Sequence, residues 1–174
     1  FSGAAIGGMI GSTIGAAVDS YRNDYGVTVE PDVTIRMRRE RVTLTGERHL
    51  SGPINQIDVH FSDTRYRHQE VEGDGAVGTT FSSTGQELRF QVHHAPVAGA
   101  KGILGFQAES LRFSALGEEA FVPGTRTRSA ALFALEEGQV GPLTLTGGLR
   151  VEQVRVSSDG DAGAAEEPRF GAAV

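Results

Sequence analysis

The sequence predicts an all-β protein, with one open, curved antiparallel sheet that forms part of a larger transmembrane β-barrel. Apolar and polar residues alternate with a period of two in most segments, as they do in strands with one apolar and one polar face. Short and longer polar connections alternate between these segments, which is typical of outer-membrane barrels. No helical period persists over a helix-length window outside residues 1–18.

The alternation is clearest in the stretch from Ile54 to Glu72. Ile57, Val59 and Phe61 fall on one face of this predicted strand, and polar side chains fall on the other. Beyond Phe61 the apolar face becomes charged. A strand that leaves a bilayer and enters water has this pattern, because its outer face need be apolar only across the hydrocarbon.

Residues 1–18 are uncharged and allow two interpretations. Glycine recurs at every fourth position from Gly3 to Gly15, and such a small-residue ridge suits a close-packed membrane helix. Alternatively, Ile14, Ala16 and Val18 alternate as in a strand. The neighbouring segments favour the strand, and a polar loop over residues 20–32 is then expected.

Residues 33–49 alternate in two phases, which predicts a β-bulge near residues 38–41. Further strands are predicted at residues 86–94, 104–109, 126–137 and 142–152. Short connections are expected at 50–53, 95–102 and 138–141, and longer ones at 72–85, 116–125 and 157–168. About seven strands result, which are too few to close a wide barrel, so we expect an open curved sheet.

Composition limits the classes of function. The 174 residues are 39% hydrophobic with a mean hydropathy of -0.20, which excludes a helical membrane protein. The net charge of -6 argues against nucleic acid as a partner. The absence of cysteine excludes disulfides, thiolate metal sites and thiol catalysis. Because residue 1 is not Met and no signal peptide follows, residues 1–174 are expected to be an internal fragment of a barrel domain.

We find no familiar catalytic or phosphate-binding motif, so we expect no enzyme activity and no cofactor. The candidate ligand-binding side chains lie on the polar face of residues 54–72: His60, Tyr66, His68 and Glu70. His68 and Glu70 are two residues apart on one strand face and are the best candidates for metal ligands. The alternative is that they belong to an ordinary hydrated barrel wall.

Glu118 and Glu119 fall in one predicted long loop, and Glu70 and Glu72 lie at the start of another. Together these carboxylates would form an acidic mouth that attracts cations. A solvated loop with no binding role is the competing interpretation.

Several of these segments resemble the barrel of TonB-dependent outer-membrane receptors, and most of all the branch that includes zinc-uptake receptors. The resemblance covers nearly all of residues 12–156. The segments that carry it most specifically are Tyr66-Arg67-His68-x-Glu70, the GEEAFVP loop at 117–123 and the G-x-R-x-E strand of Gly148, Arg150 and Glu152.

The resemblance implies a barrel of 22 strands with an N-terminal plug, and this chain would hold about seven strands and no plug. It also implies the outer membrane of a Gram-negative bacterium and contact with its lipid. Uptake of a scarce ligand, such as zinc or an iron chelate, would be driven by the TonB complex through the plug. Residues 20–32 lack the histidine-rich insertion that zinc-importing members can carry. The competing hypotheses are a passive outer-membrane barrel and a soluble β-sheet binding module.

Overall fold

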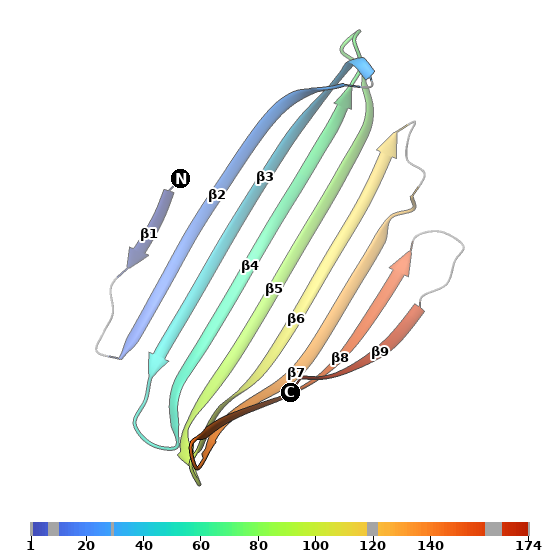
Figure 1. The fold of residues 1–174 in the computed structure, drawn as a ribbon. Helices are drawn as coiled ribbons and strands as arrows, with labels where there is room; N and C mark the ends of the chain where they lie inside the picture. The colour runs from blue at the N-terminus through green and yellow to red at the C-terminus, as the bar shows by residue number, and fades with distance from the viewer. Residues whose placement is uncertain (1, 7–10, 29, 118–121, 159–164, 174) are drawn as a thin grey trace.

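The structure is a computed structural model that describes residues 2–6, 11–28, 30–117, 122–158 and 165–173. Within these ranges the chain forms one sheet of nine strands, in which consecutive strands are antiparallel neighbours (Figure 1). The strands are β1 (Ser2–Ile6), β2 (Ser12–Val27), β3 (Glu30–His49), β4 (Ile54–Val71), β5 (Val77–Val97), β6 (Ala100–Gly117), β7 (Thr125–Val140), β8 (Leu143–Ser158) and β9 (Ala165–Ala173). None of the described residues forms a helix that is both long and apolar enough to cross a membrane.

The seven predicted strands correspond to β2–β8, and the strand interpretation of the N-terminal stretch is confirmed by β1 and the start of β2. Strand β4 pairs with β3 on one side and with β5 on the other. Figure 1 shows one curved layer with β1 and β9 at its two open edges.

From β3 to β9 the connections are unequal at the two ends of the sheet, whereas β2 and β3 are joined through residues 28–29 only. At one end, which we call the short-turn end, β3–β4, β5–β6 and β7–β8 are joined through residues 50–53, 98–99 and 141–142. Ala98 and Gly99 both have positive φ, of 52° and 84°, as the two central residues of a type I′ hairpin turn require. At the other, long-loop end, β4–β5, β6–β7 and β8–β9 are joined through residues 72–76, 118–124 and 159–164.

Strands extend into three of the predicted loops. Residues 20–27 continue β2, β5 begins at Val77 within the predicted loop 72–85, and β9 begins at Ala165 within the predicted loop 157–168. In these stretches polar and small residues predominate and large side chains such as Tyr21, Tyr25 and Phe81 are isolated, so the period of two is weak in the sequence. Their strand conformation is held by pairing with neighbouring strands.

The predicted bulge near residues 38–41 is wrong. β3 pairs with β4 from Thr34 to His49 without a register shift. The phase changes because the environment of the two faces changes: Ile35 and Met37 lie on one face near the long-loop end, and Val42 and Leu44 lie on the opposite face nearer the short-turn end.

The register assigns the two faces, because directly paired residues of antiparallel strands project to the same side. One such row joins Gly46, Val59, Phe90, Phe106, Leu132 and Val151. We call this apolar side the outer face. Leu132 is 65% exposed, Leu149 59% and Leu104 57%, so a band of large apolar side chains has no protein cover in the described part of the chain. An apolar surface of this extent marks contact with lipid or with another protein.

Candidate functional site: the inner face of the sheet

The opposite side, the inner face, carries the polar rows. The row next to that of Val59 joins Thr45, His60, Arg89, Gln107, Ala131 and Glu152. His60, a predicted ligand-binding residue, therefore lies on the inner face and lines a hollow of about 300 Å³ together with Asp58 and Arg89.

A hydrogen-bonded network occupies the middle of the inner face. Its centre is Gln107, whose side-chain oxygen accepts a hydrogen bond from Arg89 at 3.3 Å and another from Arg150 at 3.2 Å. The Gln107 amide nitrogen donates to Glu109 at 2.5 Å, and Arg150 also forms an ion pair with Glu152 at 3.0 Å. Gln107 is 8% exposed although the sheet is a single layer. The network thus fixes two guanidinium groups, one from β5 and one from β8, on either side of β6 and β7.

Aromatic side chains cover the inner face near the long-loop end. The ring of His68 stacks on Phe81, with centroids 4.5 Å apart and an interplanar angle of 26°. The Tyr66 hydroxyl lies 3.0 Å from Nδ1 of His68, and the Phe81 ring lies 6.5 Å from that of Phe113. The predicted site residues Tyr66 and His68 are therefore in direct contact, on a surface that also suits flat or apolar ligand groups.

The predicted metal site consists of His68 and Glu70, and the described residues contain no third ligand beside them. His68 and Glu70 are both on the inner face of β4, where Glu70 pairs with Ile35 and Thr79 in the register. The Tyr66 contact occupies Nδ1 of His68 and leaves Nε2 as its available metal-binding nitrogen. Across the described part of the chain, no three His, Cys, Asp or Glu side chains are grouped so as to hold a metal ion. Metal binding by His68 and Glu70 remains a prediction.

The acidic mouth is only partly described. Glu118 and Glu119 lie outside the described residues, so their relation to Glu70 is not established. Glu70 is the residue before Val71, at which β4 ends on the long-loop side.

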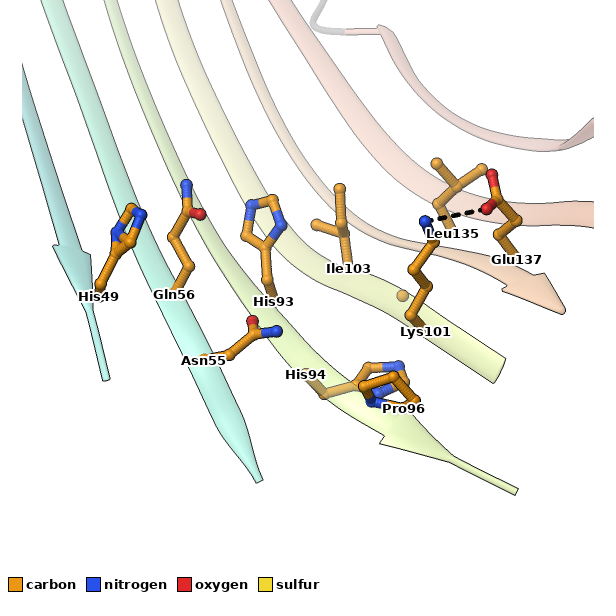
Figure 2. A pocket seen from close by; sticks show the side chains of 11 residues that line it. His49, Asn55, Gln56, His93, His94, Pro96, Lys101, Ile103, Leu135 and Glu137 are labelled. Carbon is orange, nitrogen blue, oxygen red and sulfur yellow. Dashed lines mark ion pairs between the residues drawn. The ribbon is translucent and has the colours of Figure 1, made fainter. Parts of the chain in front are cut away.

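A further hollow lies at the short-turn end, and its residues were not predicted as a site. Figure 2 shows side chains of His49, Gln56, His93, Ile103 and Leu135 side by side, and the register places them in one row across five strands. The hollow has a volume of about 630 Å³. Nε2 of His93 is 2.6 Å from Asp58, and Lys101 forms an ion pair with Glu137 at 3.0 Å.

Sequence reasoning missed this hollow and the Gln107 network for the same reason. Each depends on contacts between strands, and the alternation within a strand does not determine which residues of two strands pair. In the sequence, the only features that point to the hollow and to the network are the adjacent histidines His93 and His94 and the Arg150–x–Glu152 spacing.

Comparison with known proteins supports the fold. No protein-family model matches the chain. Among solved structures, the sheet is similar to the FrpB iron transporter from Neisseria meningitidis (F5-1 variant, apoprotein form), with a TM-score of 0.72 and 12% sequence identity. The similarity covers 92% of this chain and 30% of the transporter chain, so this chain spans less than a third of the length of its structural neighbour.

At this level of identity the similarity shows the fold alone. The predicted fold class is confirmed: the chain is an open antiparallel sheet that matches part of an outer-membrane β-barrel. The number of strands in the complete barrel remains a prediction.

Proposed function

We propose that this chain is part of the barrel wall of a TonB-dependent outer-membrane transporter. The observation that carries the proposal is the register of β2–β8, which gathers large apolar side chains on one face and a hydrogen-bonded Arg–Gln–Glu network on the other. A lipid-facing exterior and a polar lumen require this division. The structural similarity to an iron transporter supports the same assignment.

The transported ligand is proposed to be a scarce metal ion or metal chelate, taken up without a catalytic step. Iron is favoured over zinc, because the structural neighbour is an iron transporter. In addition, the described residues contain no group of three metal-binding side chains that would suit a bare zinc ion. Arg89 and Arg150 would attract the negative charge of a chelate, and the His68–Phe81 stack would contact its apolar or flat parts.

The test is uptake by the full-length parent protein in an iron-starved bacterial host, with and without a functional TonB complex. We expect accumulation of a ferric chelate that requires TonB and saturates with concentration. Uptake that is linear in concentration and independent of TonB would instead identify a passive barrel. TonB-dependent accumulation of zinc but not of iron would overturn the choice of ligand.

A second measurement tests the two faces separately. Because residues 1–174 contain no cysteine, a single cysteine can be placed at Val59 or at His60. We expect a membrane-partitioning thiol reagent to label the cysteine at position 59. A small water-soluble reagent should label the one at position 60. A soluble β module would give the same labelling by water-soluble reagent at both positions.

A further inference from the structure

The outer face of β5, β6 and β7 ends in a polar row at the short-turn end. The last apolar row that these three strands share joins Val92, Leu104 and Ala134. The following row of the same face joins His94, Gly102 and Glu136, two positions further along each strand. This polar row therefore lies beyond the apolar band, outside the part of the strands that crosses the hydrocarbon in the proposed barrel.

His94 and Glu136 form an ion pair that reaches across three strands. Nε2 of His94 on β5 lies 3.0 Å from Oε1 of Glu136 on β7, although β6 runs between these strands. Gly102 of β6 makes this reach possible, because a carbon added there would lie 2.5 Å from Cδ of Glu136 and 2.6 Å from its Oε1. On the other side of Glu136, nothing lies within 4 Å of a carbon added at Gly147 of β8. The carboxylate thus leans over the glycine of β6 toward β5.

Both ring nitrogens of His94 face oxygen acceptors. Nδ1 lies 2.8 Å from the carbonyl oxygen of Ala95, and Nε2 faces the carboxylate of Glu136. A neutral imidazole carries a single N–H and can donate to only one of these oxygens, whereas the imidazolium donates to both. The Ala95 carbonyl and the Glu136 carboxylate accordingly raise the pKa of His94 above its usual value. The geometry of the pair suits the charged form of His94.

The other strands next to His94 place no competing charge beside it in the described part of the outer face. β4 contributes Ile54 directly opposite His94, and β6 contributes Gly102. On the same face, Arg48 belongs to β3, two strands away from β5. The nearby charged side chains of the inner face form pairs of their own: His93 with Asp58, and Lys101 with Glu137. Glu136 is therefore the group that responds most directly to the charge of His94.

We propose that His94 and Glu136 form a pH-sensitive clamp, which holds the short-turn ends of β5, β6 and β7 together while His94 is protonated. Because the pKa of His94 is raised in the folded chain, the contribution of the clamp is complete below the pKa of an unfolded histidine. It is lost as the pH rises through the higher pKa of the folded state. The neutral ring then donates one hydrogen bond at most, and Glu136 stays at the edge of the apolar band without a cation. The inference does not depend on which ligand is transported.

The test is hydrogen–deuterium exchange of the full-length parent protein in detergent micelles, corrected for intrinsic exchange, at about pH 5.5 and about pH 8.5. In the wild type, we expect amides at the short-turn ends of β5, β6 and β7 to lose protection by roughly two- to fivefold at the higher pH. A loss of this size corresponds to one partly exposed ion pair. His94→Gln and Glu136→Gln should each abolish the pH dependence. His94→Lys keeps a cation at both pH values and should keep the protection at both.

Two matched controls lie one residue away, on the opposite face of the same strands. His93→Gln removes the inner-face histidine of β5 that pairs with Asp58, and Glu137→Gln removes the inner-face carboxylate of β7 that pairs with Lys101. Both variants should retain the pH dependence of the wild type at the short-turn ends, because neither side chain contributes to the clamp.

The inference is overturned if protection in the wild type is the same at both pH values, or if Glu136→Gln keeps the pH dependence. It is also overturned if His93→Gln abolishes that dependence as fully as His94→Gln does. If neither Gln variant folds, His94→Lys decides, and a loss of protection in it at the higher pH contradicts the clamp. The proposed transport function is measured separately by uptake, so either proposal can fail without the other.

Discussion

The ring of Phe133 on β7 lies directly against Gly105 of β6 on the inner face and fills the space that a side chain at position 105 would occupy. Aromatic cover of this kind compensates for a glycine in a strand by packing its bare backbone. Phe133 lines one hollow of the inner face together with the network residues Arg89, Gln107 and Arg150.

Gly105→Ala should therefore destabilise the barrel by about 1–3 kcal/mol, because the new methyl group would overlap with the Phe133 ring. The matched control is Gly147→Ala on the outer face, where nothing lies within 4 Å of the added carbon. There we expect no loss, since alanine restricts the unfolded chain more than glycine does. Urea unfolding of the full-length protein in detergent measures both. Equal losses would show that Phe133 moves aside freely.

The apolar outer face predicts that an arginine substitution costs more stability on that face of a strand than on the inner face. Leu149→Arg would place a charge in hydrocarbon and should cost about 2–4 kcal/mol if the position is near the midplane. Thr146→Arg lies on the inner face of the same strand β8 and should cost far less, since its guanidinium would face water. Heat-modifiability on gels of the full-length protein reports the folded fraction. Similar losses for the two variants would argue against a lipid-facing surface.

The Gln107 side chain should be more important to stability than other glutamines of the inner face. Gln107→Leu preserves volume but removes the oxygen that accepts hydrogen bonds from Arg89 and Arg150, so we expect a loss of about 1–2 kcal/mol. Gln91→Leu is the control, since Gln91 makes no side-chain hydrogen bond with the described residues. It should change the free energy of unfolding by less than about 0.5 kcal/mol. A loss as large for Gln91 would show that the network is not the cause.

The strand framework was predictable because alternation is a property of single strands. Val59 and His60 are adjacent, and their opposite polarity was sufficient to assign them to the two faces that the register confirms. The same logic failed in β3. There, Ile35 and Met37 are apolar on the inner face, because aromatic side chains such as Phe81 line that face near the long-loop end. A reversal of polarity along the strand was thereby mistaken for a bulge.

The contacts between strands could not be predicted in the same way. Gln107 is separated from Arg89 by 18 positions and from Arg150 by 43, and nothing in either segment specifies the pairing. The same holds for the opposed arginines Arg38 and Arg67, which are ordinary alternating positions until the register is known. Register in a sheet of this kind depends on turn geometry and on the match of whole apolar faces, which are properties of several strands together.

His68 allows packing and binding to be separated. His68→Phe should preserve the stack on Phe81, so we expect stability to fall by less than about 1 kcal/mol. It removes the imidazole nitrogens, so if His68 binds the transported metal, its affinity should fall at least tenfold. Equilibrium binding of the metal or chelate by the full-length protein measures the effect, with Tyr66→Phe as the comparison. Unchanged affinity would assign His68 to the hydrated wall rather than to the ligand site.

Residues 1–174 expressed alone should not give a stable soluble monomer. In the described part of the chain, β1 and β9 each pair on one side only, so both edges present unpaired backbone groups that recruit other chains. The outer band would also be exposed to water, with Leu132, Leu149 and Leu104 each more than half exposed. We therefore expect aggregation, or recovery only in detergent. Size-exclusion chromatography without detergent measures this, and a sharp monomer peak with cooperative unfolding would favour a soluble β-sheet module over a wall segment of a barrel.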